Sequence, residues 1–189
     1  MNKVFFGNNI KSYLLCSGLG IAAGLLVAFF SRFPADDLWA IALFSSRTFG
    51  FWICSCSLIA LFSERHYSAG INVALYVYFM FYITGIFKRL AVVEKGHNTM
   101  SYFWDGLWQE LAYGLLPALV CFALAFVLWY GRKKSKICVV LRFLPSLFIA
   151  LEAAGCFVMV IIRGRGLFMT LVDSVSVIMF LFIVLKSSR

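Results

Sequence analysis

Residues 143–162 read FLPSLFIALEAAGCFVMVII, a run of twenty residues in which Glu152 is the only charged side chain. About 20 apolar residues in a helix cover the hydrocarbon core of a bilayer. Within that core a helix can make all of its backbone hydrogen bonds internally. The stretch therefore predicts a transmembrane helix. Glu152, near the middle of it, must face something other than lipid.

The rest of the chain has the same character. Of its 189 residues, 63% are hydrophobic and 13% are charged, whereas a soluble domain is about half apolar and about a quarter charged. Six apolar segments follow one another with short connections, at about 12–31, 38–63, 69–87, 107–130, 138–162 and 167–185. We therefore expect one all-α transmembrane domain over residues 1–189, a polytopic integral membrane bundle of six transmembrane helices.

The first segment has a weakly basic start before its apolar run, as a signal peptide does. The run of about 19 residues exceeds the apolar region of a usual signal peptide, about 7–15 residues. We expect it to be retained as the first span.

The second segment, 38–63, allows two interpretations because the polar residues SSRT at 45–48 interrupt it. It could form one long tilted helix with Arg47 in its outer third. Alternatively, residues 35–46 lie along the membrane interface and a shorter span starts near Thr48. The second interpretation is favoured, because Pro34 followed by two aspartates and a tryptophan is typical of a helix start at a headgroup boundary.

Basic residues lie between the spans, so the net charge of +9 indicates membrane topology and not nucleic-acid binding. With alternating spans, one face carries ten Lys and Arg residues and the other carries seven. Basic loops stay in the cytoplasm, so the first face, which includes both termini, is predicted to be cytoplasmic. Its loop RKKSK at 132–136 is expected to touch anionic lipid. Docking of a membrane or cytoplasmic partner protein is the alternative.

Glu152 and Asp173 are predicted to lie near each other. The turn IRGRGL at 162–167 joins the fifth and sixth segments tightly, so the two helices should be neighbours. Asp173 lies about two turns into the sixth segment, and Arg163 follows Glu152 by about three turns on nearly the same side of the helix. We expect the two carboxylates to line one outward-opening cavity.

Three further polar or aromatic residues are expected at similar outer depth. Arg47 lies in the second segment, and Glu110 and Trp108 lie in YFWDGLWQELAYG at 102–114. In a structural interpretation, the charged residues form buried pairs that fix helix register, and the tryptophans form an interfacial belt. In a functional interpretation, they form an outward-facing ligand site for a small polar or cationic solute. The members of that candidate site are Glu152, Asp173, Arg47, Glu110, Trp108 and Arg163.

No metal or catalytic site is predicted. The six cysteines lie in or beside apolar segments and are expected to be small buried side chains. Cys54 and Cys56 point about 200° apart on a helix, so they cannot share a metal ion. His66 and His97 fall in loops on opposite faces, and the chain lacks HExxH, GxSxG and Walker motifs. We expect a non-enzymatic protein without a cofactor.

A stripe of small residues runs along the first segment, formed by Cys16, Gly20, Gly24 and Ala28. Such a stripe lets another helix approach closely. That helix could belong to the same chain or to a partner.

Four stretches carry a resemblance to other proteins: LWAIALFSSRTFGFW (38–52), AGINVALYVYFM (69–80), LPSLFIALEAAGC (144–156) and LFMTLVDSVSVI (167–178). They resemble small, uncharacterised six-span membrane proteins of Gram-positive bacteria. The resemblance implies a multi-pass protein of the bacterial cell membrane, and it implies no activity. It also implies that Glu152 and Asp173 belong to the recurring pattern of that group.

The size, the six spans, the cytoplasmic termini and the polar outer cavity are similar to the substrate-binding subunits of energy-coupling-factor transporters. Those subunits carry an AxxxA face on the first helix, and Gly20, Gly24 and Ala28 take that place here. The similarity implies a solute-binding transport subunit. The alternative is a non-transport interaction protein, such as a chaperone, immunity factor or regulator, whose buried charges are structural.

Overall fold

The computed structural model describes residues 4–44, 49–96, 98–133 and 135–188. Lys3, Arg47, His97, Lys134 and Arg189 lie outside the described residues. The predicted all-α class is confirmed, because the described part consists almost entirely of helices. They are α1 (Ile10–Phe30), the 3₁₀ turn η1 (Ile41–Leu43), α3 (Phe49–Leu61), α4 (His66–Glu94), α5 (Met100–Leu128), the 3₁₀ turn η2 (Trp129–Arg132), α6 (Lys136–Arg163) and α7 (Leu167–Ser188).

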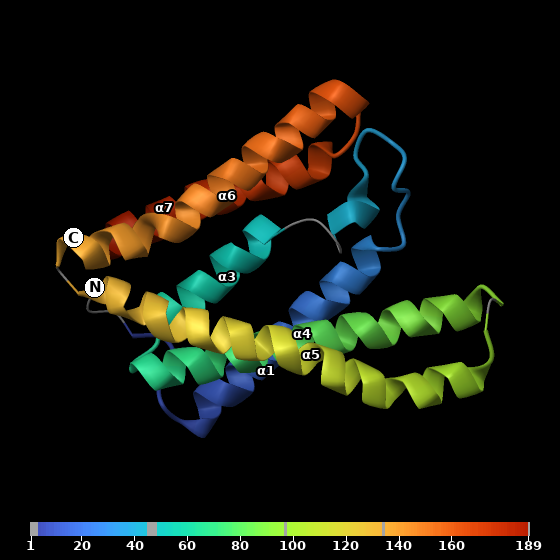
Figure 1. Ribbon diagram of the computed structural model, residues 1–189, viewed down its shortest axis with the longest axis horizontal. Helices are drawn as coiled ribbons and strands as arrows, with labels where there is room; N and C mark the ends of the chain where they lie inside the picture. The colour runs from blue at the N-terminus through green and yellow to red at the C-terminus, as the bar shows by residue number, and fades with distance from the viewer. Residues whose placement is uncertain (1–3, 45–48, 97, 134, 189) are drawn as a thin grey trace.

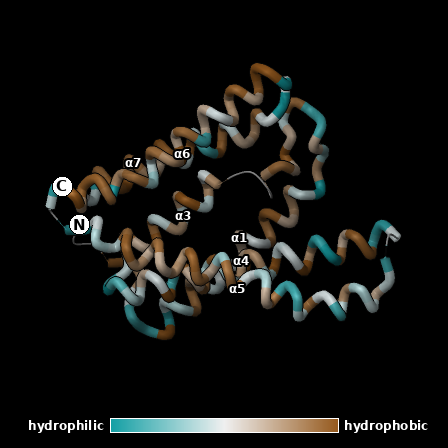
Figure 2. The backbone as a smooth tube through the Cα atoms, viewed as in Figure 1, coloured by the Kyte–Doolittle hydropathy of each residue, from teal (hydrophilic) through white to brown (hydrophobic). Residues whose placement is uncertain are grey.

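Five of these helices, α1, α4, α5, α6 and α7, are long and apolar enough to cross a membrane. Their apolar residues lie along the middle of each helix, and hydrophilic residues gather towards the helix ends (Figure 2). This distribution is the one that a multi-pass membrane protein requires.

The predicted count of six spans is not confirmed. Within the predicted segment 38–63, the described helix α3 has 13 residues, about 20 Å in length, against a hydrocarbon core of about 30 Å. Ahead of it the chain turns at Ala40, whose φ of 45° is incompatible with a continuing right-handed helix. One of the two expectations for this segment is a single long helix. The segment instead contains a turn at Ala40 and the short helix α3.

The short helix α3 lies between two pairs of long helices (Figure 1). On one side it contacts the α4–α5 hairpin, whose helix α4 also packs along α1, and on the other side it contacts the α6–α7 hairpin. One apolar core joins α1, α3, α4 and α5, and a second joins α3, α6 and α7. Both chain termini lie at the same end of the bundle (Figure 1).

The small-residue stripe of α1 packs against α4 of the same chain. A Cβ atom placed on Gly24 would lie 2.8 Å from the Met80 carbonyl oxygen, and one on Gly20 would collide with the Tyr76 carbonyl. Cys16 and Ala28, at the ends of the stripe, are also buried. The stripe is therefore used within the chain.

Hydrogen bonds around Ser63 anchor the C-terminal end of α3. The Trp129 indole Nε1 donates to the Ser63 carbonyl oxygen at 2.9 Å, and the Asn72 amide donates to the Ser63 hydroxyl at 3.2 Å. The backbone N–H groups of Phe5 and Phe6 donate to the Phe62 carbonyl at 3.0 and 3.2 Å. Hydrogen bonds from the N-terminal segment, α4 and η2 thus meet at the end of α3.

Candidate functional site

Glu152 of α6 meets the first residue of α3. Its Oε1 atom accepts a hydrogen bond from the Phe49 backbone N–H at 2.6 Å, and the Gly50 N–H also interacts with this carboxylate. The first N–H groups of a helix have no partner within the helix, and the helix dipole favours a negative charge at this position. Glu152 therefore acts as a cap, supplied by another helix, for an α3 that begins within the bundle.

Asp173 of α7 lies against the same end of α3. It is fully buried, and a Cβ atom on Gly50 would collide with its Oδ1 atom. The Cys156 thiol contacts its Oδ2 atom at 3.7 Å, while Oδ1 has no hydrogen-bond partner. The two predicted carboxylates are thus brought together, at the N-terminus of a short helix.

Glu110, in contrast, belongs to a pair on the other side of α3. The Arg89 Nε atom of α4 donates to Glu110 Oε1 at 2.6 Å, and the two side chains are only 10% and 17% exposed. Arg89 also donates to Gln109 Oε1 at 2.9 Å. Gly85 and Gly106 make room for the pair, because a Cβ on either would collide with Glu110 or Arg89 respectively. Glu110 therefore forms a buried ion pair between α4 and α5.

Two of the other predicted site residues, Trp108 and Arg163, are exposed. The Trp108 side chain is 77% exposed on the outside of α5, as expected for an interfacial belt. Arg163 is exposed at the last position of α6. Arg47 lies outside the described residues.

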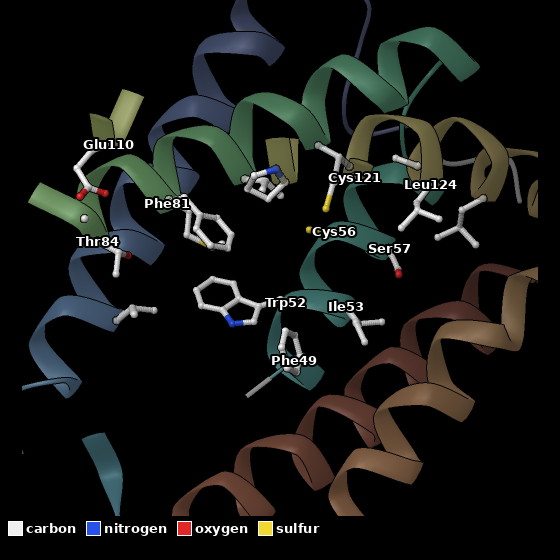
Figure 3. Close-up of a pocket in the computed structure, with 18 of the residues that line it drawn as sticks. Phe49, Trp52, Ile53, Cys56, Ser57, Phe81, Thr84, Glu110, Cys121 and Leu124 are labelled. Carbon is white, nitrogen blue, oxygen red and sulfur yellow. The ribbon is translucent and has the colours of Figure 1, made fainter. Parts of the chain in front are cut away.

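A cavity of about 570 Å³ lies between α1, α3, α4 and α5, and we call it the main cavity. Its walls are mostly apolar and aromatic, and Figure 3 shows Phe49, Trp52 and Phe81 around it. The side chains of Cys56 and Cys121 lie near each other in its middle (Figure 3). Such a volume lies within the range of about 300–1,000 Å³ found for small-molecule sites.

Polar groups gather at one end of the main cavity. Thr84 and Glu110 lie together at that end (Figure 3), and Lys88, one turn beyond Thr84, is also part of the lining. The lining residues of α4 extend from Val73 to Lys88, fifteen residues or roughly 22 Å along the helix. The main cavity is therefore elongated, with an apolar body and a polar end.

The helix α3 presents different faces to the main cavity and to the carboxylates. Phe49, Trp52 and Ile53 line the main cavity, whereas Gly50 contacts Asp173. The Cys54 thiol lies on the second face too, 3.6 Å from the Ser176 carbonyl oxygen.

Sequence reasoning missed the role of Arg89 and the main cavity. Arg89 was expected beyond the end of the segment 69–87, whereas α4 continues to Glu94. The two glycines beside the pair, Gly85 and Gly106, were a pattern that could have pointed to it. Among the described residues, no group of three or more His, Cys, Asp or Glu side chains is placed to hold a metal ion.

Comparisons with known proteins find no match for this chain. No protein-family model matches the chain, and neither a curated protein nor a solved structure is similar enough to match it.

Proposed function

We propose that this protein binds an elongated, mostly apolar molecule with an anionic end group in the main cavity, and that it serves as a solute-binding subunit in membrane transport. The observation that carries the proposal is the main cavity itself, about 570 Å³ in volume and lined along α4 from Val73 to Lys88. The transport role is proposed from the resemblance of the sequence, in its size and in the six spans that it predicts, to energy-coupling-factor subunits.

The charges at the polar end favour an anionic group. Glu110 is already paired with Arg89 at 2.6 Å, so its charge is compensated within the protein. Lys88 is exposed and lines the same end, and none of the ion pairs among the described residues includes it. The net charge of these three side chains is positive, which suits a carboxylate or a phosphate.

The apolar body of the cavity favours a chain-like or ring-containing hydrocarbon. This ligand class differs from the small polar or cationic solute that the sequence predicts, because the carboxylates Glu152 and Asp173 are not part of the lining. A fatty acid and a lipophilic organic anion share the required chemistry.

The first test is native mass spectrometry of the protein extracted in mild detergent from its own host. We expect a small-molecule adduct, which Ala125→Phe should remove, because Ala125 lines the main cavity. Ala123→Phe is the matched control, because Ala123 lies two residues away on the exposed side of α5. An adduct that survives Ala125→Phe, or a second polypeptide in place of an adduct, contradicts the proposal. The second polypeptide would support the interaction alternative.

The second test uses a fluorescent polyene fatty acid as the probe. Lys88→Gln should weaken its binding several-fold, because the anionic end loses its cation. Lys95→Gln should leave binding unchanged, since Lys95 is exposed beyond the end of α4 and is not part of the lining. Equal effects of the two substitutions would show that only the general surface charge matters.

A further inference from the structure

The N-terminus of α3 holds two carboxylate groups in a small, buried space. Glu152 Oε1 accepts the Phe49 N–H at 2.6 Å, and Asp173 contacts Gly50 from the other hairpin helix. The two side chains therefore contact consecutive residues at the start of α3. One oxygen of each, Glu152 Oε2 and Asp173 Oδ1, is buried and has no hydrogen-bond partner.

Among the described residues, the charges around the start of α3 do not balance if both carboxylates are ionised. A helix N-terminus is equivalent to roughly half a positive charge, which compensates at most one carboxylate. None of the ion pairs among the described residues includes Glu152 or Asp173. Two negative charges side by side, with no cation among the described residues paired to either, are costly away from water.

The hydrogen-bond inventory leads to the same conclusion. Ionised carboxylates only accept hydrogen bonds, whereas a protonated one also donates. In the described parts of α3, α6 and α7, the Cys156 thiol is the titratable group that contacts one of the two acids, and the Cys54 thiol lies one turn beyond Gly50 on α3. Cys54 is directed to the Ser176 carbonyl and Cys156 to Asp173 Oδ2, so both unpartnered carboxylate oxygens lack a donor. A proton on Asp173 turns one of its oxygens into a donor and removes one of the two negative charges.

We propose that Glu152 and Asp173 form a buried proton-binding site, in which Glu152 stays ionised as the cap of α3 and Asp173 holds the proton. Asp173 is fully buried and Glu152, at the same end of α3, is partly exposed, so we assign Glu152 as the route by which the proton reaches Asp173. Loss of the proton places a second negative charge beside Gly50 and loosens the contact between α3 and α7. The proposal does not depend on what the main cavity binds.

The test is the thermal unfolding of the purified protein in detergent as a function of pH. A folded state that holds an extra proton loses stability as the pH rises, so the wild-type midpoint should fall from acidic to alkaline pH. Asp173→Asn, which imitates the neutral acid, should match the wild type at acidic pH and lose this decline. Asp105→Asn is the control, because Asp105 is exposed on α5, and it should keep the wild-type decline. A decline that Asp173→Asn leaves unchanged overturns the proposal.

Infrared spectroscopy of the wild type provides a test that needs no variant. At neutral pH we expect the carbonyl stretching band of a protonated carboxylic acid, shifted by exchange into heavy water. Absence of the band overturns the proposal even where Asp173→Asn does not fold. A midpoint that rises with sodium chloride but not with choline chloride also overturns it, because the site then binds a metal cation in place of a proton.

Discussion

The Glu152 carboxylate of α6 accepts a hydrogen bond from the backbone N–H of Phe49, the first residue of α3, at 2.6 Å. This bond explains why a glutamate stands in the middle of an apolar helix. A helix of 13 residues is too short to place both ends at the membrane surfaces, and Glu152 supplies an acceptor from a neighbouring helix for its first N–H group.

Replacement of Glu152 tests the bond directly. Glu152→Ala removes the acceptor and should lower the free energy of unfolding by about 1–2 kcal/mol, the upper range for loss of a helix cap. Glu152→Gln keeps an amide oxygen in the same position and should cost less. Denaturant titration in mixed micelles measures both, with Leu151→Ala on the exposed side as the control. Equal losses for Gln and Ala would show that the hydrogen bond is unimportant.

The pair Arg89–Glu110 should behave as a buried ion pair. Glu110→Leu leaves the Arg89 charge without its partner and should cost about 3–5 kcal/mol. The double variant Arg89→Leu with Glu110→Leu should recover much of this loss, because it removes both charges. The exposed pair Arg32–Glu94, with its atoms 3.8 Å apart, is the control, and Glu94→Gln should change stability by less than about 1 kcal/mol. Additive effects in the double variant would contradict the pairing.

The close approach of α1 to α4 can be tested with two glycines of one helix. Gly20→Ala introduces a methyl group against the Tyr76 carbonyl and should destabilise the protein by about 1–3 kcal/mol. Gly18 has open space around it, so Gly18→Ala should be neutral or stabilising by up to about 1 kcal/mol through helix propensity. Thermal unfolding of the two variants side by side decides the matter. If both substitutions change the stability in the same direction, the close α1–α4 contact does not lie at Gly20.

The cysteines of the main cavity test the position of α3 against α5. Cys56 and Cys121 lie near each other in the lining of the main cavity (Figure 3), so mild oxidation should join them by an intrachain disulfide. Peptide mapping by mass spectrometry should find that bond in the wild type and not in Cys56→Ser. Cys138→Ser should leave it intact, because Cys138 lies on α6. A disulfide between other cysteines would refute this placement of the helices.

Five long helices were predictable because a bilayer imposes one simple requirement, about 20 apolar residues per span. The split of the second segment was the favoured of two interpretations, because SSRT at 45–48 is polar, but hydropathy does not record where the chain turns. The turn occurs at Ala40, in a left-handed conformation. An alanine in the sequence does not predict that conformation.

The candidate site was predicted unevenly for a related reason. Asp173 and Glu152 lie on helices joined by a short turn, so their proximity followed from the connection. The pairing of Glu110 with Arg89 could not be predicted in this way. Arg89 lies beyond the apolar part of its segment, although the helix continues to Glu94. The main cavity depends on side-chain packing among four helices, and a single sequence contains no pattern for the space left between them.

The cap of α3 has a consequence for how the protein is made. Glu152 follows Phe49 by 103 residues, and ribosomes add about 5–20 residues per second. For roughly 5–20 seconds of translation, the first amides of α3 lack this acceptor, at a cost of several kcal/mol for each one left in hydrocarbon. We therefore expect α3 to reach its final depth only after α6 has left the ribosome. Ribosome-bound chains that end before α6 should react at Cys54 with a membrane-impermeant thiol reagent, and chains that include α7 should not. The order in which this membrane protein inserts then differs from the order in which it is synthesised.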